Sequence, residues 1–231
     1  MLEITPAEWT AILLSLRVAA VATLVATPLG VALAWLLARK DFWGKSLVDA
    51  LVHLPLVLPP VVTGYLLLLT FGRRGLVGAW LADHLGIVFA FRWTGAALAC
   101  GVMSFPLLVR PMRLSIEAVD QRLEQAAETL GATPWWVFLS VTLPLSLPGV
   151  FAGMVLGFAK AIGEFGATIT FVSNIPGETQ TISSAIYSLI QTPDGDTAAL
   201  RLVAISIVIA VAALIGSEWF ARRATQRLHG N

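Results

Sequence analysis

Few residues of this chain have the types and spacing that chemistry requires. No set of His, Cys or carboxylate residues stands at metal-ligand spacing around His53. His53 is therefore interpreted as a hydrogen-bonded residue near a membrane surface. The single cysteine, Cys100, excludes an intrachain disulfide and a cysteine metal cluster, which leaves a small packing residue. The sequence contains no GxxxxGK[ST] phosphate loop, no HExxH pair and no Ser/Lys dyad. The chain is therefore not expected to be an enzyme or to hydrolyse ATP by itself.

One acid and one base do stand at a productive spacing. Lys160 and Glu164 are four residues apart in AKAIGE, so they can pair across one helical turn. One interpretation is a structural ion pair at the outer end of a helix. The other is a gate in which Gly163 and Gly166 give the backbone freedom around Phe165. Both interpretations stay open at this point.

A short polar helix is predicted over residues 120–131. Asp120 is a good N-cap and Gly131 a good C-terminal stop. Apolar residues at i, i+3, i+4 and i+7 define one face: Leu123, Ala126, Ala127 and Leu130. The opposite face is polar: Gln121, Arg122, Glu124, Gln125 and Glu128. Because this polar face is more acidic than basic, contact with a partner protein is favoured over binding to an anionic membrane surface.

The elements that must position these residues are membrane spans. The chain is 57% hydrophobic and only 13% charged, against about 25% charged in ordinary soluble domains. Five segments are long and apolar enough to cross a bilayer: residues 18–38, 50–72, 93–109, 131–159 and 202–217. The expected fold is all-α and polytopic, one domain over residues 1–231 with a cytoplasmic loop at 117–136. Residues 162–197 leave open a sixth span or short helices that are re-entrant or interfacial.

Basic residues predict the orientation, because cytoplasmic loops are enriched in Lys and Arg. Three segments that fall on one side of a five-span chain, 39–45, 110–122 and 222–227, hold nine of the fifteen basic residues, and the other side holds only three, in 73–92. The N-terminus is therefore predicted outside and the C-terminus inside. Tryptophans near the predicted span ends, Trp219 among them, agree with these boundaries.

The short helix resembles the EAA motif of ABC importer permeases. That motif reads Glu-Ala-Ala, three residues, Gly, nine residues, then Ile-x-Leu-Pro. The chain carries the same spacing in Gln125-Ala126-Ala127, Gly131 and Val141-Thr142-Leu143-Pro144. Two positions depart from the motif, since Gln125 replaces Glu and Val141 replaces Ile. Gln125 removes a charge that could pair with a basic residue of the ATPase.

Two further segments narrow the resemblance within this family. The run LPLVLPP at 54–60 and the stretch AKAIGEFGATITFVSNIPGETQT at 159–181 are similar to the molybdate permeases of ModB type. Sulfate permeases are usually longer relatives with a comparable Gly-Glu-Phe/Tyr-Gly segment. The resemblance implies an ABC importer type I permease fold in a bacterial inner membrane. It also implies that the residues contacting the ATPase are Leu123, Glu124, Gln125, Ala126, Ala127, Glu128, Gly131, Leu143 and Pro144.

The resemblance also implies the partners. Two copies of the chain would form the pathway, two cytoplasmic ATPase subunits would hold ATP and Mg, and a periplasmic binding protein would deliver molybdate or tungstate. No cofactor is expected in this chain. The spans carry no Lys or Arg near their centres, where an unpaired charge costs about 3 kcal/mol or more.

Molybdate and tungstate are dianions. Because the span centres carry no Lys or Arg, such a dianion is expected to cross a transient polar cavity rather than a fixed cationic site. The prolines of span 50–72, which bend helices, are either packing kinks or part of the pathway lining. Candidates for the pathway and its gate are Pro59, Pro60, Thr63, Ser104, Lys160, Gly163, Glu164, Phe165, Gly166, Thr168, Thr170 and Ser173.

Other functions fit less well. A sulfate or thiosulfate permease remains the nearest alternative. An ion-coupled secondary transporter would need acids deep in the spans and an inverted repeat, and neither is visible in the sequence. A membrane enzyme would need a catalytic cluster, and a plain channel does not explain the spacing of residues 125–144.

Overall fold

The computed structural model describes residues 4–229, and side chains are described for residues 4–213, 215 and 216. Every regular element in this part of the chain is a helix. The elements are α1 (Pro6–Arg39), α2 (Lys45–Val57), α3 (Pro60–Phe71), α4 (Leu76–Leu85), α5 (Trp93–Glu117), α6 (Gln121–Thr129), α7 (Pro134–Val137), the π-helix η1 (Phe138–Thr142), α8 (Leu143–Ile162), α9 (Gly166–Val172), α10 (Ile182–Leu189) and α11 (Asp196–His229). The predicted all-α class is confirmed.

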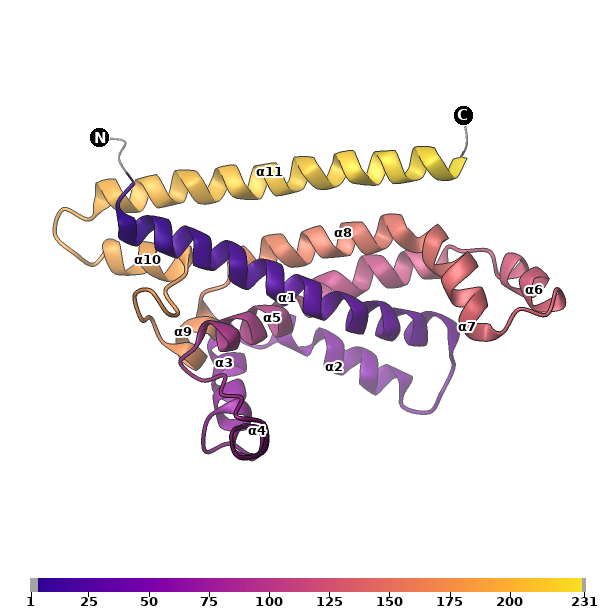
Figure 1. The fold of residues 1–231 in the computed structure, drawn as a ribbon, viewed down its shortest axis with the longest axis horizontal. Helices are drawn as coiled ribbons and strands as arrows, with labels where there is room; N and C mark the ends of the chain where they lie inside the picture. Colours follow the sequence, from indigo (N-terminus) through magenta and orange to yellow (C-terminus); the bar gives the residue numbers. More distant parts are fainter. Residues whose placement is uncertain (1–3, 230–231) are drawn as a thin grey trace.

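Three long helices, α1, α5 and α8, run side by side along the longest axis and form the core (Figure 1). Helix α8 approaches α5 closely because glycines of α8 lie at the contact between the two helices. A Cβ atom at Gly149 would collide with Ser115, and one at Gly153 with the carbonyl of Leu108. Such small residues allow helices to pack tightly where lipid supplies no hydrophobic drive. Cys100 is buried in this core, as expected of a packing residue.

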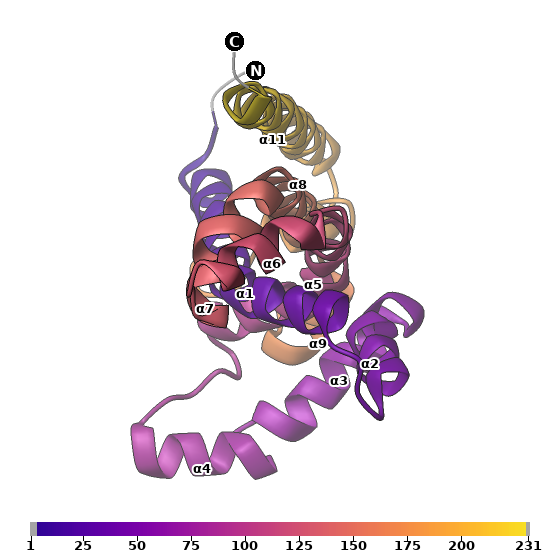
Figure 2. The ribbon, with the colours of Figure 1, turned by 90° about the vertical axis from the view of Figure 1, so that its right-hand side faces the viewer.

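Helix α11 lies along the outside of the bundle and packs against α8 and α10 (Figure 2). Its apolar residues Leu200, Ile207 and Val208 are exposed. A long helix that leaves such residues uncovered is suited to face lipid or another subunit. The side chains of Trp219, Arg222, Arg223 and Arg227, used to predict the orientation, lie outside those that the structure describes.

The predicted spans hold with one correction. By length and composition, four described helices or continuous helical segments can cross a membrane: α1, α5, α7 to α8, and α11. The predicted span at 50–72 is instead two helices, α2 and α3, which meet at 115° and count at most as one broken span. Pro55 is accommodated inside α2, but Leu58 is extended before Pro59 and Pro60. Two successive prolines lack backbone donors and disfavour helical geometry in the residue before them, so the chain breaks here rather than bending slightly.

The ends of the bundle differ in composition. Residues 162–197 form the two short helices α9 and α10, so the alternative of a sixth span is wrong. These helices and the start of α1 lie at one end, and α6, α7 and the loop 40–44 lie at the other (Figure 1). The basic segments 39–45 and 110–122 therefore share the α6 end. At the opposite end, Thr5 and Glu8 form a capping box at the start of α1.

Candidate functional site

Local capping defines helix α6 as the sequence predicts. The Asp120 carboxylate accepts a hydrogen bond from the Arg122 backbone N–H at 2.9 Å. At the other end Gly131 has φ of 87°, its N–H donates to the Glu128 carbonyl, and the Ala132 N–H donates to the Ala127 carbonyl. This pattern is a Schellman motif, in which a left-handed residue closes the last turn. Glycine fits that position because it has no Cβ.

The apolar face of α6 is uncovered within the chain. Leu123 is 51% exposed and Leu130 is 89% exposed, and Ala126 is exposed beside them. Ala127 is half-buried, and Gln125 and Glu128 are exposed. Leu123, Ala126 and Leu130 thus form an exposed apolar stripe at one end of the bundle, of the kind that marks a contact surface.

Glu124 corrects the predicted arrangement of this helix. The sequence pattern places it on the outward polar face, but its side chain is only 15% exposed and turns toward the bundle. Its Oε1 accepts hydrogen bonds from Arg39 and from the Thr142 hydroxyl. Neither partner stands at a helical spacing from Glu124, so periodicity could not find them. The one signal in the sequence for a partner of Glu124 was a basic residue, Arg39, at the end of the first span.

The second half of the motif lies where η1 passes into α8, and its residues Leu143 and Pro144 are half-buried. Leu143 and Pro144 begin α8, directly after the π-helix η1. Leu143 is partly buried and packs against a cluster that includes Met112 and Ile116, so it supports the start of α8. Thr133 is the N-cap residue before Pro134, but its side chain makes no capping hydrogen bond.

At the opposite end, the predicted pair of Lys160 and Glu164 is confirmed. The Lys160 Nζ lies 2.7 Å from Glu164 Oε2, and Glu164 Oε1 accepts the Ala167 backbone N–H at 3.0 Å. The Glu164 side chain is almost fully buried. It joins the end of α8 to the first turn of α9, with Gly163 and Phe165 between them. Gly166 packs against the Pro60 side chain, which couples this junction to α3.

The predicted pathway hydroxyls are not gathered around one cavity. Thr63, Ser104 and Thr168 are buried inside the chain. Thr168 and Thr170 donate to carbonyls of their own helix turn. Ser173 is exposed, with φ of 65°.

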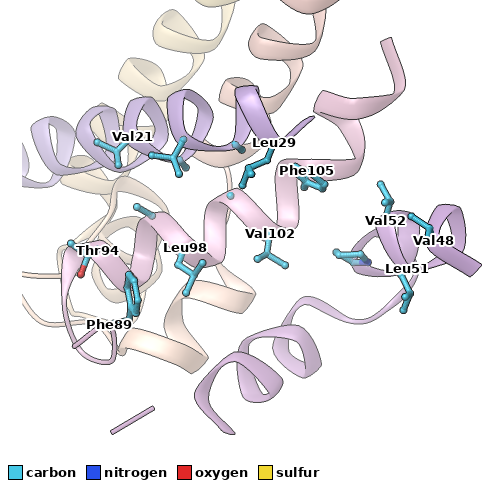
Figure 3. A pocket seen from close by; sticks show the side chains of 16 residues that line it. Val21, Leu29, Val48, Leu51, Val52, Phe89, Thr94, Leu98, Val102 and Phe105 are labelled. Atoms are coloured by element: carbon cyan, nitrogen blue, oxygen red, sulfur yellow. The ribbon is translucent and has the colours of Figure 1, made fainter. Parts of the chain in front are cut away.

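One cleft on the described part of the chain is apolar. It has a volume of about 630 Å³ and lies between α1, α2 and α5 (Figure 3). Its lining includes Val21, Leu51 and Leu98, and Thr94 is the one lining residue with a polar side chain. None of the predicted pathway residues contacts this cleft. A second cleft of about 610 Å³, lined by residues 86–89 and 91–94 and by Glu178, is more polar.

His53 makes its polar contacts with Asp49, one turn earlier in the same helix. Its Nδ1 lies 2.8 Å from the Asp49 carbonyl and 3.7 Å from the Asp49 carboxylate. That carboxylate also pairs with Arg113 of α5 at 2.8 Å. The predicted role as a hydrogen-bonded residue is confirmed.

Comparisons with known proteins agree with these features. Residues 26–226 match the family described as "Binding-protein-dependent transport system inner membrane component". The chain is 60% identical over 224 residues to the molybdenum transport system permease protein ModB of Escherichia coli (strain K12), with 97% of this chain and 98% of that protein covered. It is 56% identical over 221 residues to ModB of Haemophilus influenzae, with 96% of each covered. It is 39% identical over 186 residues to the sulfate transport system permease protein CysT of Escherichia coli, with 80% and 65% covered.

Solved structures share the fold at low identity. A bacterial ABC transporter that imports alginate matches with a TM-score of 0.75 and 20% identity, over 96% of this chain and 82% of that chain. The inward-facing MetNI methionine ABC transporter matches with a TM-score of 0.69 and 14% identity, over 94% of each chain. The permease fold, the motif spacing around α6 and the match over most of the length lead to one conclusion. The chain belongs to the family of inner membrane components of binding-protein-dependent transport systems.

Proposed function

We propose that this chain is the membrane-spanning subunit of an ABC importer for molybdate. The assignment of molybdate as the substrate rests on the 60% identity to a molybdenum transport permease across nearly the full length of both chains. The 39% identity to a sulfate permease is much lower and covers less of that relative. ATP hydrolysis belongs to a separate subunit, and a binding protein delivers the oxyanion.

Two copies of the chain form the pathway in this proposal. The apolar lining of the cleft between α1, α2 and α5 is unsuited to a dianion, which needs polar groups to replace its hydration. The predicted hydroxyls are mostly enclosed within the chain. A polar route therefore has to be completed between copies.

Helix α6 is the contact with the ATPase. Its exposed Leu123 and Leu130 give an apolar stripe, and its short length and fixed caps make it a rigid element that a cleft can grip. The α6 end also holds the basic segments 39–45 and 110–122. By the positive-inside rule this end lies in the cytoplasm, and the start of α1 lies in the periplasm.

A bulky residue on the apolar stripe tests this contact. Ala126→Trp places a large side chain at a position exposed in the chain, so the permease itself should fold normally. The complete complex is reconstituted in liposomes with its ATPase and with molybdate-loaded binding protein. Stimulation of ATP hydrolysis by the loaded binding protein is expected to fall roughly tenfold, which corresponds to about 1.4 kcal/mol.

The matched control is Gln121→Trp. This neutral residue is exposed on the opposite face of the same helix, so stimulation should be retained. Unchanged stimulation in Ala126→Trp would contradict the assignment of α6. Sulfate-loaded binding protein in the same assay tests the substrate, because equal stimulation by sulfate would favour the sulfate alternative.

A further inference from the structure

Helix α6 is attached to the bundle mainly through polar contacts of one side chain. None of the nine residues of α6 is buried. Glu124 is nevertheless largely enclosed, and its Oε1 accepts three hydrogen bonds. Arg39 donates two of them, from Nη2 at 3.0 Å and from Nε at 3.2 Å, and Thr142 donates the third from its hydroxyl at 2.5 Å.

The two donors come from different spans. Arg39 is the last residue of α1, and its side chain is 9% exposed. Its Nη2 also donates to the carbonyl of Val119, in the turn between α5 and α6, at 3.0 Å. Thr142 is the last residue of η1, is 1% exposed and leads directly into α8. The ends of α1 and of η1, which leads into α8, thus meet at a single carboxylate oxygen on α6, and Arg39 also bonds the turn that follows α5.

The π-helix explains why Thr142 can reach Glu124. The Leu143 N–H donates to the Phe138 carbonyl, one residue further back than in an α-helix. Pro144 follows and has no N–H of its own, and in a regular α-helix its ring would clash with the carbonyl four residues earlier, that of Ser140. A widened turn relieves that clash and rotates the residues before it. The proline at the end of the motif therefore helps to direct the Thr142 side chain toward α6.

We propose that Glu124 is a positioning residue for coupled transport, and that Arg39, Glu124 and Thr142 form a strut between α6 and the spans α1 and α8. The strut fixes the angle of α6, so that a displacement of α6 moves the ends of both spans. This inference rests on the proposed contact between α6 and the ATPase. A charged hydrogen-bond network of low exposure suits this role because its bonds are directional, whereas apolar contacts let a helix slide.

The readout is the number of molybdate ions transported per ATP hydrolysed in the reconstituted complex. Glu124→Gln keeps the side-chain length but removes the charge that strengthens the three bonds. We expect this ratio to fall roughly tenfold, while ATP hydrolysis continues, in line with the loss of charged hydrogen bonds. A residue with a merely structural role would lower the amount of assembled complex and leave the ratio of the assembled complexes unchanged.

A second set of variants keeps the test informative if Glu124→Gln assembles poorly. Thr142→Val removes the hydroxyl at nearly constant shape and should lower the ratio, whereas Thr142→Ser keeps the hydroxyl and should restore it. Arg39→Lys should also lower the ratio, because an ammonium cannot place two nitrogens on one carboxylate and a third bond on Val119. Asp41→Asn, in an exposed ion pair at the same end, is the control and should change nothing.

The outcomes separate this inference from the proposed function. If Ala126→Trp retains full stimulation, the ATPase contact fails and the strut fails with it. If Ala126→Trp loses stimulation but Thr142→Val and Glu124→Gln keep the normal ratio, only the strut is overturned. Loss of stimulation in Ala126→Trp together with a reduced ratio in Thr142→Val, restored in Thr142→Ser, supports both.

Discussion

The two ends of the bundle each hold a glutamate of low exposure, but they are built differently. At the α9 end, Glu164 pairs with Lys160 one helical turn away and caps the first turn of α9, which is packed against α3. At the α6 end, Glu124 binds Arg39, which is 85 residues away in sequence, and the helix that carries it has no buried residue. One carboxylate lies inside a packed junction, and the other fastens an exposed helix to the bundle.

This difference separates a fixed junction from a movable one. Backbone atoms at the α9 end are in direct contact: a Cβ atom at Gly64 of α3 would lie 2.5 Å from the Ala167 carbonyl oxygen. Close-packed interfaces of this kind resist displacement. Helix α6 has no buried residue, and it can move as a unit as far as its polar bonds allow. The α6 end is thus suited to receive motion, and the α9 end to resist it.

The largest expected effect comes from breaking the packed junction. Gly64→Ala inserts a methyl group against the Ala167 backbone, which cannot move away as a flexible side chain would. Overpacking of this kind should lower the free energy of unfolding by about 3 kcal/mol. Thermal unfolding of the purified permease in detergent measures it. Gly101→Ala is the control, because its new Cβ would meet the nearest atom only at 3.8 Å; equal melting temperatures for the two variants would refute the comparison.

A smaller effect should follow from removing the carboxylate at the same end. Glu164→Ala leaves the Ala167 N–H without its acceptor and Lys160 without its partner. We expect a loss of about 2 kcal/mol in the free energy of unfolding. Glu164→Gln retains an acceptor for Ala167 and should lose less. Should both variants unfold at the temperature of the unaltered permease, Glu164 would not stabilise the junction between α8 and α9.

The smallest effect is expected at an exposed pair near α6. A hydrogen bond from Lys45, reinforced by its charge, holds the pKa of Asp41 below its usual value. The folded pKa lies below the unfolded one, so any stabilisation is present above the unfolded pKa and disappears as pH falls through the folded pKa. Because Asp41 is fully exposed, Asp41→Asn should leave the melting temperature and its pH dependence unchanged. A clear loss of stability above pH 5 in this variant would show that the pair of Asp41 and Lys45 stabilises the folded chain, contrary to this expectation.

Local features were the most predictable from the sequence. The caps of α6 and the pair of Lys160 and Glu164 were predicted correctly, because each joins residues within about one helical turn. The number and position of the spans followed from long apolar segments, with the exception of residues 50–72. There the prolines indicated a bend, but the angle of 115° also depends on where α3 packs against α9.

The sequence by itself therefore determined the helices, their caps and the spacing between α6 and Pro144, since these depend on neighbouring residues. The tertiary structure decided that Glu124 turns inward, that Arg39 and Thr142 meet it, and that Thr63, Ser104 and Thr168 are enclosed. Those outcomes require α1, α5 and α8 to be packed first, because only their packing brings together side chains that no helical period relates.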